Sequence, residues 1–510
     1  MMTENNQQPN ILFVIADQMT PFMTGVYGDT VAQTPNLDKL AASGIRFDSA
    51  YTPCPICAPA RASMLTGRYI SRIGAYDNST PWPDEEPTFA HYLSKAGYDT
   101  VASGKMHFIG ADQQHGFAKR LTTDIFPAGL GWTTSRQEKT AFSDIHSQPI
   151  AIDYVTAGVR QWSMQFEFDE EVQFRALQYL HSRRMQVGGT MQKPQKQRNS
   201  QPFCLCVSYS HPHEPFHPTQ ELWDRYDNAK IDIPQFPENM SETYSKMDVW
   251  LNAFHGVHRV DLKNEKNLYN LRRSYYALVS YVDDKVGELI KCLEETGLAD
   301  NTIVIFTSDH GDMLGEKGMI QKRCFYERSS RVPLIIKYPD KHFKGRVETR
   351  HCSLVDLAPT VLDMAGIPDK ERLSLDGQSL TGPTGSGNSG DNNDRAVFSE
   401  LHTEGVYTPC FMMREGQFKY IYIHNNACQL FNTEHDPKEW KNLSGNPDYA
   451  ELEDHMKCRI LEKFDPDAID IAVTKSLAKR TLVRDAMKAA NISWDFSPYF
   501  DATRQYWREG

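Results

Sequence analysis

The fold of this chain is decided by the stretch Asn10-Ile11-Leu12-Phe13-Val14-Ile15-Ala16-Asp17-Gln18. A short apolar run with β-branched side chains, bounded by polar residues, is typical of a strand buried in a sheet. We therefore predict a first strand over Asn10–Ala16, with Asp17 and Gln18 at its carboxyl end.

Beyond this stretch, apolar strands alternate with amphipathic helices. Further strands are predicted at Tyr98–Ala102, Phe203–Tyr209 and Thr302–Thr307. Helices are predicted at Pro35–Gly44, Phe89–Gly97 and Tyr275–Thr296. This alternation predicts an α/β fold with a largely parallel sheet.

Polar clusters follow directly after three of the predicted strands. They are Asp17-Gln18, His211-Pro212-His213 and Ser308-Asp309-His310-Gly311-Asp312. Ligands of open α/β sheets bind at the carboxyl ends of the strands, so we expect these clusters to converge.

The segment Thr381–Asp394 is rich in Gly, Ser and Asn and predicts a flexible linker. We expect a catalytic domain over residues 1–380. We expect a smaller α+β domain over residues 395–510, with an antiparallel sheet and a helical tail. Its hairpin is predicted at Phe411–Ile423, around the turn Glu415-Gly416.

The composition excludes several classes of protein. The net charge of −11 argues against a nucleic-acid-binding protein, and we assign the basic segment Arg183–Arg198 to a solvated loop. No run approaches the roughly 20 apolar residues that span a bilayer. Met1–Gln8 has neither the basic nor the apolar region of a secretory signal. We expect a cytoplasmic protein with no nucleic-acid or membrane partner.

The run Cys57-Ala58-Pro59-Ala60-Arg61 carries the strongest chemical signal. If Pro59 starts a helix, Arg61 lies one turn after Cys57, and the amides at the helix start face any bound anion. Lys105-Met106-His107 places a cation and an imidazole on the same side if the segment is extended.

Asp17, Asp309 and His310 could ligate a metal ion together with a modified Cys57. Carboxylates at strand ends favour a hard divalent cation, Ca²⁺ or Mg²⁺, over Zn²⁺. Taken alone, Asp17 could equally cap a turn, and Asp309-His310 could be a turn.

Together these segments resemble the type I, formylglycine-dependent sulfatases of the alkaline phosphatase superfamily. Within that superfamily the chain is most similar to choline sulfatases, through Gly104–His107, His115-Gly116-Phe117 and Leu121–Pro127. The resemblance implies a large mixed, mostly parallel sheet flanked by helices. It also implies that a formylglycine-generating enzyme oxidises Cys57. One hydroxyl of the hydrated aldehyde would attack sulfur, and the other would later expel sulfate.

The resemblance also implies roles for matching residues. The ligands of Ca²⁺, or less favourably Mg²⁺, would be Asp17, formylglycine 57, Asp309 and His310. The groups that bind sulfate oxygens would be Arg61, Lys105 and Lys322, assisted by Asn78. Asp309 would help to deprotonate the attacking hydroxyl. His213 would protonate the leaving oxygen, and His107 would take the proton of the second hydroxyl.

The implied substrate is a small sulfate ester, with choline-O-sulfate as the first choice. A quaternary ammonium needs an aromatic face and a nearby carboxylate, for which Trp132 and Glu404 match the choline sulfatase pattern. Phe142–Asp153 lacks the His-Asn pair expected of such a pocket, unless His146 takes its place. The resemblance further implies a homo-oligomer, a dimer or a tetramer.

Other functions stay open. Another small alkyl or aryl sulfate would use the same machinery, and so would a phosphonate monoester or phosphodiester. Cys54-Pro55-Ile56-Cys57 is also a C-x-x-C, which suggests a thiol oxidoreductase or half of a zinc site. A binding protein whose Cys57 is never modified is a further alternative.

Overall fold

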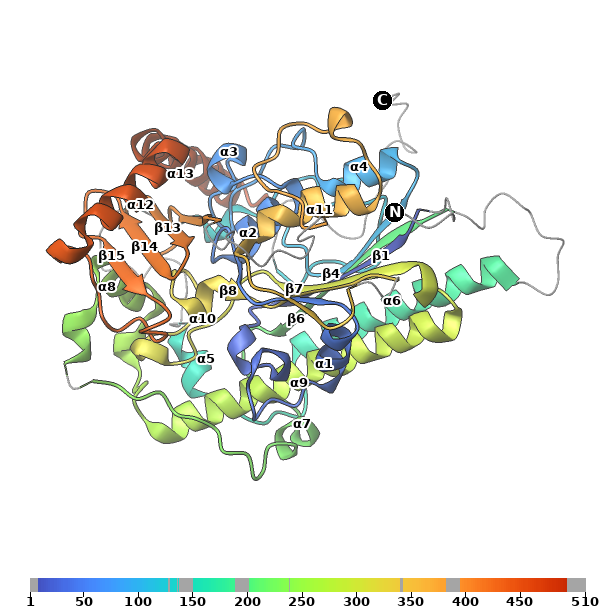
Figure 1. The fold of residues 1–510 in the computed structure, drawn as a ribbon, viewed down its shortest axis with the longest axis horizontal. Helices are drawn as coiled ribbons and strands as arrows, with labels where there is room; N and C mark the ends of the chain where they lie inside the picture. The colour runs from blue at the N-terminus through green and yellow to red at the C-terminus, as the bar shows by residue number, and fades with distance from the viewer. Residues whose placement is uncertain are drawn as a thin grey trace.

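An eight-stranded mixed sheet forms the centre of the molecule (Figure 1). The computed structural model describes residues 8–126, 129–134, 136, 150–188, 201–237, 239–339, 343–381 and 395–492. The strands of this sheet, in spatial order, are β10 (Arg346–Glu348), β2 (Ile45–Phe47), β9 (Leu334–Lys337), β7 (Thr302–Ser308), β1 (Asn10–Asp17), β6 (Phe203–Pro212), β4 (Asp99–Gly104) and β5 (Lys119–Arg120). β9 runs antiparallel to both of its neighbours, and the other adjacent pairs are parallel. The predicted α/β fold with a mostly parallel sheet is confirmed.

Successive side chains of β1 point to opposite faces of the sheet and contribute to two separate hydrophobic cores. Leu12, Val14 and Ala16 face one apolar cluster, whereas Ile11, Phe13 and Ile15 face the other. The first cluster is covered by α1 (Pro35–Ala42), α6 (Met164–Gly188) and α9 (Glu265–Thr296). The second is covered by α2 (Cys57–Thr66), α4 (Phe89–Lys95) and α11 (Leu357–Met364). Figure 1 shows these two sets of helices on opposite faces of the sheet.

Two predicted helical boundaries are wrong. α9 begins at Glu265 rather than Tyr275, because the Asn264 side chain caps an earlier turn by accepting from the amide of Asn267. The segment from Arg183 to Gly188, predicted as a loop, is the last part of α6. Among the described residues, no helix has both the length and the apolar character needed to cross a bilayer.

A second, antiparallel sheet of four strands packs beside the main one. Its strands are β12 (Val397–Leu401), β13 (Cys410–Glu415), β14 (Phe418–Ile423) and β15 (Gln429–Asn432). The predicted hairpin is therefore confirmed, and it turns at Gly416 with a φ of 49°. One face of this sheet shares an apolar cluster with Cys54 and Ile56, directly before Cys57. Residues 382–394 of the predicted linker lie outside the described residues, so the domain boundaries stay a prediction.

Helices α12 (Ala450–Lys463) and α13 (Pro466–Ala489) follow the second sheet. α12 packs against β13 and β14, whereas α13 packs against the short 3-10 helix Leu130–Trp132. The last described helix therefore contacts a segment that lies much earlier in the sequence.

Gly104 allows the end of β4 to lie against β6. Its φ is 105°, and a Cβ at this position would lie 1.9 Å from the carbonyl oxygen of Ser208. The next amide, of Lys105, donates to that same oxygen at 2.9 Å. Only glycine fits this close approach, which directs the chain into the segment Lys105-Met106-His107.

We expect Gly104→Ala to lower the free energy of unfolding by about 3 kcal/mol or more, because it adds a backbone clash to the cost of a left-handed φ. Gly97→Ala is the matched control, since Gly97 has a φ of 91° and nothing within 4 Å of its would-be Cβ. The control should lose only about 1 kcal/mol. Denaturant unfolding measures both values, and equal losses would contradict the role of the Ser208 contact.

Candidate active site

Cys57 is the first residue of α2, which is buried over its whole length. The helix begins two residues before Pro59, so Pro59 is its third residue and Arg61 still lies one turn after Cys57. Proline is tolerated throughout the first turn, where its missing N–H needs no partner. The amide of Ala58 donates to Asn78 Oδ1 at 2.9 Å. Asn78 therefore satisfies one of the amides that we expected to face an anion.

Four potential metal ligands meet at the carboxyl ends of β1 and β7. Cys57 Sγ lies 3.2 Å from His310 Nε2 and 3.8 Å from Asp17 Oδ1. The ligand atoms of Asp17, Cys57, Asp309 and His310 all lie within 4.8 Å of one another and are buried. The structure thus brings together the predicted cation ligands.

The residues of this cluster fit a hard divalent cation. Burial, together with the charges of Asp309 and Cys57, raises the pKa of Asp17 although Lys105 opposes the effect, and a bound divalent cation would stabilise such crowded acidic groups. His310 Nδ1 lies 3.0 Å from the carbonyl oxygen of Gly311, which can only accept a proton. The proton of a neutral His310 therefore resides on Nδ1, leaving Nε2 as a ligand.

The cysteines do not support a zinc or dithiol site. Within the described part of the chain, the cluster capable of metal binding includes Cys57 but not Cys54, Cys204 or Cys206. Burial raises the pKa of Cys54 well above its ordinary value, with Glu400 and Glu404 adding to the effect. For Cys57 burial acts in the same direction, but Lys105, Lys322 and His310 outweigh it and lower the pKa well below its ordinary value. The two thiols therefore lie in opposite electrostatic environments.

Two buried cations lie beneath Cys57. Arg61 donates from Nε to Asp309 Oδ2 at 2.9 Å and from Nη1 to Ser208 Oγ at 2.8 Å. Lys105 Nζ donates to Asp17 Oδ2. Burial opposes ionisation of Asp309, but the charges of His310 and Arg61 hold its pKa at about 2. The pair with Arg61 thus favours an ionised Asp309, whereas Lys105 only partly offsets the burial that raises the pKa of Asp17.

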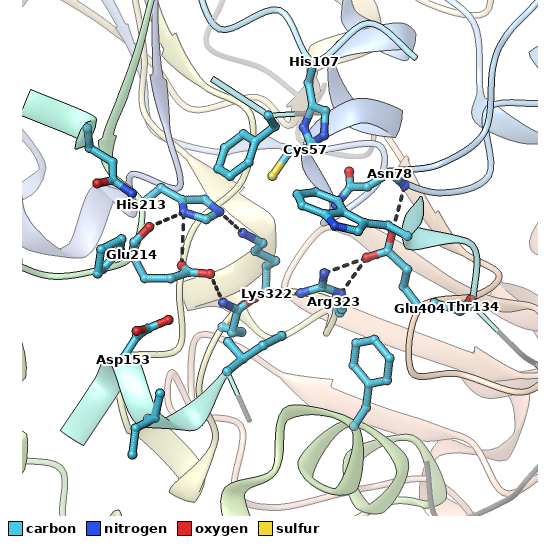
Figure 2. A pocket seen from close by; sticks show the side chains of 18 residues that line it. Cys57, Asn78, His107, Thr134, Asp153, His213, Glu214, Lys322, Arg323 and Glu404 are labelled. Atoms are coloured by element: carbon cyan, nitrogen blue, oxygen red, sulfur yellow. Dashed lines mark hydrogen bonds and ion pairs between the residues drawn. The ribbon is translucent and has the colours of Figure 1, made fainter. Parts of the chain in front are cut away.

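A pocket of about 320 Å³ opens above Cys57 (Figure 2). The side chains that line it include the predicted residues Cys57, Asn78, His107, Trp132, His213, Lys322 and Glu404. Arg61, Lys105, Asp17, Asp309 and His310 are not among the lining residues and lie deeper. The predicted site residues therefore form two layers: a buried charged layer and a pocket above it.

His107 lies beside Cys57 in Figure 2. Its segment is not extended, because His107 has a φ of 57°. Its ring packs against Phe126 at 5.4 Å and against Trp132 at 5.9 Å between centroids. Both ring nitrogens are buried and have no hydrogen-bond partner among the described residues. The imidazole is thus held by aromatic contacts and is free to exchange a proton with a group in the pocket.

His213 and Lys322 share a hydrogen bond. Lys322 Nζ lies 2.7 Å from His213 Nε2, and His213 Nδ1 lies 2.8 Å from the carbonyl oxygen of Glu214. The Gln18 side chain connects this pair to Glu214, since its Nε2 donates to Glu214 Oε2 at 2.7 Å and its Oε1 accepts from Lys322. Burial alone would raise the pKa of Glu214, but the charges of His213 and Lys322 lower it to about 2.

Glu404 is already paired in the pocket. Its Oε2 accepts from Arg323 Nε at 3.0 Å and from Nη2 at 2.6 Å, while its Oε1 accepts from the amide of Asn78 at 2.6 Å. The structure places Glu404 where we expected it, but its charge is compensated by Arg323.

Sequence reasoning missed Gln18, Glu214 and Arg323. Each follows a predicted site residue directly, namely Asp17, His213 and Lys322. Adjacency in sequence was the signal that could have found them, and for Gln18 and Glu214 the position just after a strand added to it. Most of the segment Phe142–Asp153, residues 142–149, lies outside the described residues, but Asp153 lies on α5 (Ala151–Val155) and lines the pocket.

Helix α13 holds the loops that border the pocket. Arg480 donates to both oxygens of Asp77 at 2.8 Å, and Asp77 directly precedes Asn78. Arg484 donates to the carbonyl oxygen of Thr133, next to Trp132, at 3.0 Å. A helix far along the chain therefore positions two of the predicted substrate-binding residues.

Known proteins match this chain over most of its length. The family model described as Sulfatase matches residues 9–367, and one described as N-sulphoglucosamine sulphohydrolase, C-terminal, matches residues 315–465. A choline-sulfatase of Rhizobium meliloti is 37% identical over 510 residues, covering 98% of this chain and 96% of that protein. An arylsulfatase of Clostridium perfringens is 28% identical over 480 residues, covering 90% and 95%.

Solved structures share the fold. A phosphonate monoester hydrolase of Agrobacterium radiobacter gives a TM-score of 0.70 at 22% identity, covering 89% of this chain and 95% of that chain. A structure in complex with D-glucosamine-2-N,6-O-disulfate gives 0.67 at 24% identity, covering 90% and 99%. With the family match across most of the chain, the conclusion is that this protein belongs to the sulfatase family and is a sulfuric ester hydrolase.

Proposed function

We propose that the protein hydrolyses choline-O-sulfate, or a similarly small cationic alkyl sulfate, with a formylglycine at position 57. The observation that carries this proposal is the position of Cys57, which lies at the floor of the pocket and in contact with Asp17 and His310. The pocket also has an aromatic wall of Phe126 and Trp132, 5.7 Å apart, suited to an alkylammonium group. The similarity to a choline-sulfatase supports this choice of leaving group.

Formylglycine supplies, as its hydrate, a nucleophilic hydroxyl and a second hydroxyl on the same carbon. Its formation requires a formylglycine-generating enzyme. Asp17, residue 57, Asp309 and His310 would hold a divalent cation, for which we favour Ca²⁺ over Mg²⁺. The cation would neutralise charge on the sulfate oxygens.

The chain's own residues bind sulfate and move protons. Lys322 lines the pocket and offers its ammonium to a sulfate oxygen, while Arg61 and Lys105 hold the carboxylates beneath. His213 Nε2, which lies 2.7 Å from Lys322 Nζ, can pass a proton to the leaving oxygen. His107, with two unpartnered ring nitrogens among the described residues, accepts the proton released at residue 57.

Cys57→Ala should abolish turnover of choline sulfate, because no other side chain supplies the aldehyde. Cys54→Ala is the matched control. Its side chain is buried but lies outside the metal-ligand cluster, so most activity should remain. Initial rates on the matured enzyme measure both effects, and peptide mass analysis reports the conversion of Cys57. Equal loss from the two variants would favour a dithiol mechanism instead.

Removal of divalent cations by a chelator should lower turnover by about 100-fold or more, because the buried carboxylates lose their counter-charge and sulfate loses its electrophilic partner. Ca²⁺ should restore activity better than Mg²⁺, and the cation should also raise the midpoint of thermal unfolding. Asp17→Asn should weaken both responses. A chelated enzyme with full activity would contradict the metal assignment.

Trp132→Ala should lower kcat/KM for choline sulfate by about 10-fold, and less for a neutral aryl sulfate, because the cation loses an aromatic face. Trp162→Ala is the control, since Trp162 is 63% exposed and does not line the pocket. An unchanged preference would remove Trp132 from cation recognition.

Assay of an aryl phosphonate monoester beside choline sulfate tests the alternative that the same nucleophile cleaves phosphonates. A phosphonate monoester hydrolase shares this fold.

A further inference from the structure

The geometry points to Asp153, rather than Glu404, as the carboxylate that recognises the positive charge of the leaving group. This inference rests on the proposed function, because it assumes a cationic sulfate ester. It concerns the pocket wall formed by α5, to which the sequence assigned no role.

Glu404 is poorly suited to attract a cation. Both of its carboxylate oxygens are occupied, one by the Arg323 guanidinium and one by the Asn78 amide. Arg323 is also held by Gln321 Oε1 at 2.7 Å and is only 7% exposed, so Glu404 cannot leave it without stranding a buried charge. To a quaternary ammonium in the pocket, the pair has no net charge.

Glu214 is compensated as well. It receives hydrogen bonds from Gln18 and Gln321, and the charges of His213 and Lys322 lower its pKa. Among the described residues, the carboxylates that line the pocket are Asp153, Glu214 and Glu404. Two of the three are therefore already neutralised by the protein.

Asp153 is the carboxylate that remains. It is half-buried and lines the pocket, and its carboxylate has no hydrogen-bond or ion-pair partner in the part of the chain that the structure describes. Figure 2 shows Asp153 and Glu404 on opposite sides of the pocket. Burial, together with the charge of Glu214, raises the pKa of Asp153 to about 6 against the opposing effect of His213. A positive charge bound beside it would relieve this unfavourable environment.

The surroundings of Asp153 suit a methylated cation. Ile150, Ile152 and Pro215 line the same pocket and offer apolar contact to methyl groups. The neighbouring Tyr154 anchors α5, because its hydroxyl donates to Asp312 Oδ2 and accepts from Gln18 at 3.3 Å. Asp153 is therefore presented on a helix fixed to the catalytic layer.

The test compares choline sulfate with its neutral isostere, 3,3-dimethylbutyl sulfate, on matured enzyme. Asp153→Asn should lower kcat/KM for choline sulfate by about 10-fold and leave the neutral ester unchanged within about threefold. Glu221→Gln, which removes an exposed carboxylate outside the pocket, is the control and should leave both values unchanged. Glu404→Gln should lower kcat/KM for both esters by a similar factor, because it disturbs Arg323 and Asn78.

The pH dependence of the ratio of the two kcat/KM values gives a second measurement. The groups facing Asp153 are Glu214 and His213. Their effects on the chemical steps are common to both esters and cancel in the ratio, and the Asp153→Asn variant, which keeps both groups, shows what they contribute to binding of the cation. Protonation of Asp153 removes its charge. The preference of the wild type for choline sulfate should therefore fall as the pH drops through about 6, and the ratio for Asp153→Asn should stay flat.

The outcomes separate the two proposals. If the wild type cleaves neither ester, the proposed function fails. If it cleaves both but Asp153→Asn keeps the full preference, or if the preference falls in Glu404→Gln alone, the assignment of Asp153 is overturned and the sulfatase activity stands. A wild type that does not prefer choline sulfate over the neutral ester also overturns it.

Discussion

The structure depends on one constraint: acidic groups that must remain ionised are buried at the ends of central strands. Asp17 and Asp309 follow β1 and β7, which are adjacent and parallel, so both carboxylates reach the same point. Burying either charge alone would be prohibitive. Lys105 and Arg61 compensate them by direct contact, and removal of one partner of such a buried pair costs about 3–5 kcal/mol.

The backbone must take particular conformations for these two cations to reach the carboxylates. Lys105 reaches Asp17 because β4 approaches β6 closely at Gly104, where a side chain would meet the backbone of Ser208. Arg61 reaches Asp309 because α2 starts at Cys57 and directs Arg61 one turn later toward the sheet. The same turn that carries Cys57 therefore also carries a counter-charge, which couples the position of Cys57 to the stability of the core.

The pocket above this layer is assembled from distant parts of the chain. Glu404 follows the first strand of the small sheet, Trp132 lies on a 3-10 helix, and Asp153 lies on α5. Helix α13 supports two of these walls through Arg480 and Arg484. The buried charged layer lies at the ends of strands of the large sheet, and the walls of the pocket come from loops and from later segments of the chain. Such a division allows the leaving group to change while the sulfate chemistry stays the same.

The local pattern of apolar residues was enough to predict the central strands of the large sheet. The apolar run Ile11–Ala16 predicts β1, and the strand at Thr302–Thr307 places Asp309 and His310 at its carboxyl end, because side-chain periodicity and strand length are local properties. The candidate ligands Asp17, Asp309 and His310 were predictable because they follow predicted strands, and Cys57 was predictable from the run Cys57–Arg61. Residues 142–149 and 382–394 lie outside the described part of the chain, so the predictions that fall on them stay predictions.

What only the tertiary structure decided is which charges are already paired. The sequence by itself determined that Glu404 and Trp132 are candidates for the leaving group, and that Lys322 is a candidate for sulfate. It did not reveal that Arg323 neutralises Glu404, that Gln18 joins Lys322 to Glu214, or that Asp153 has no partner among the described residues. The physical reason is that the net charge of a site depends on contacts between residues far apart in sequence, which local pattern does not encode.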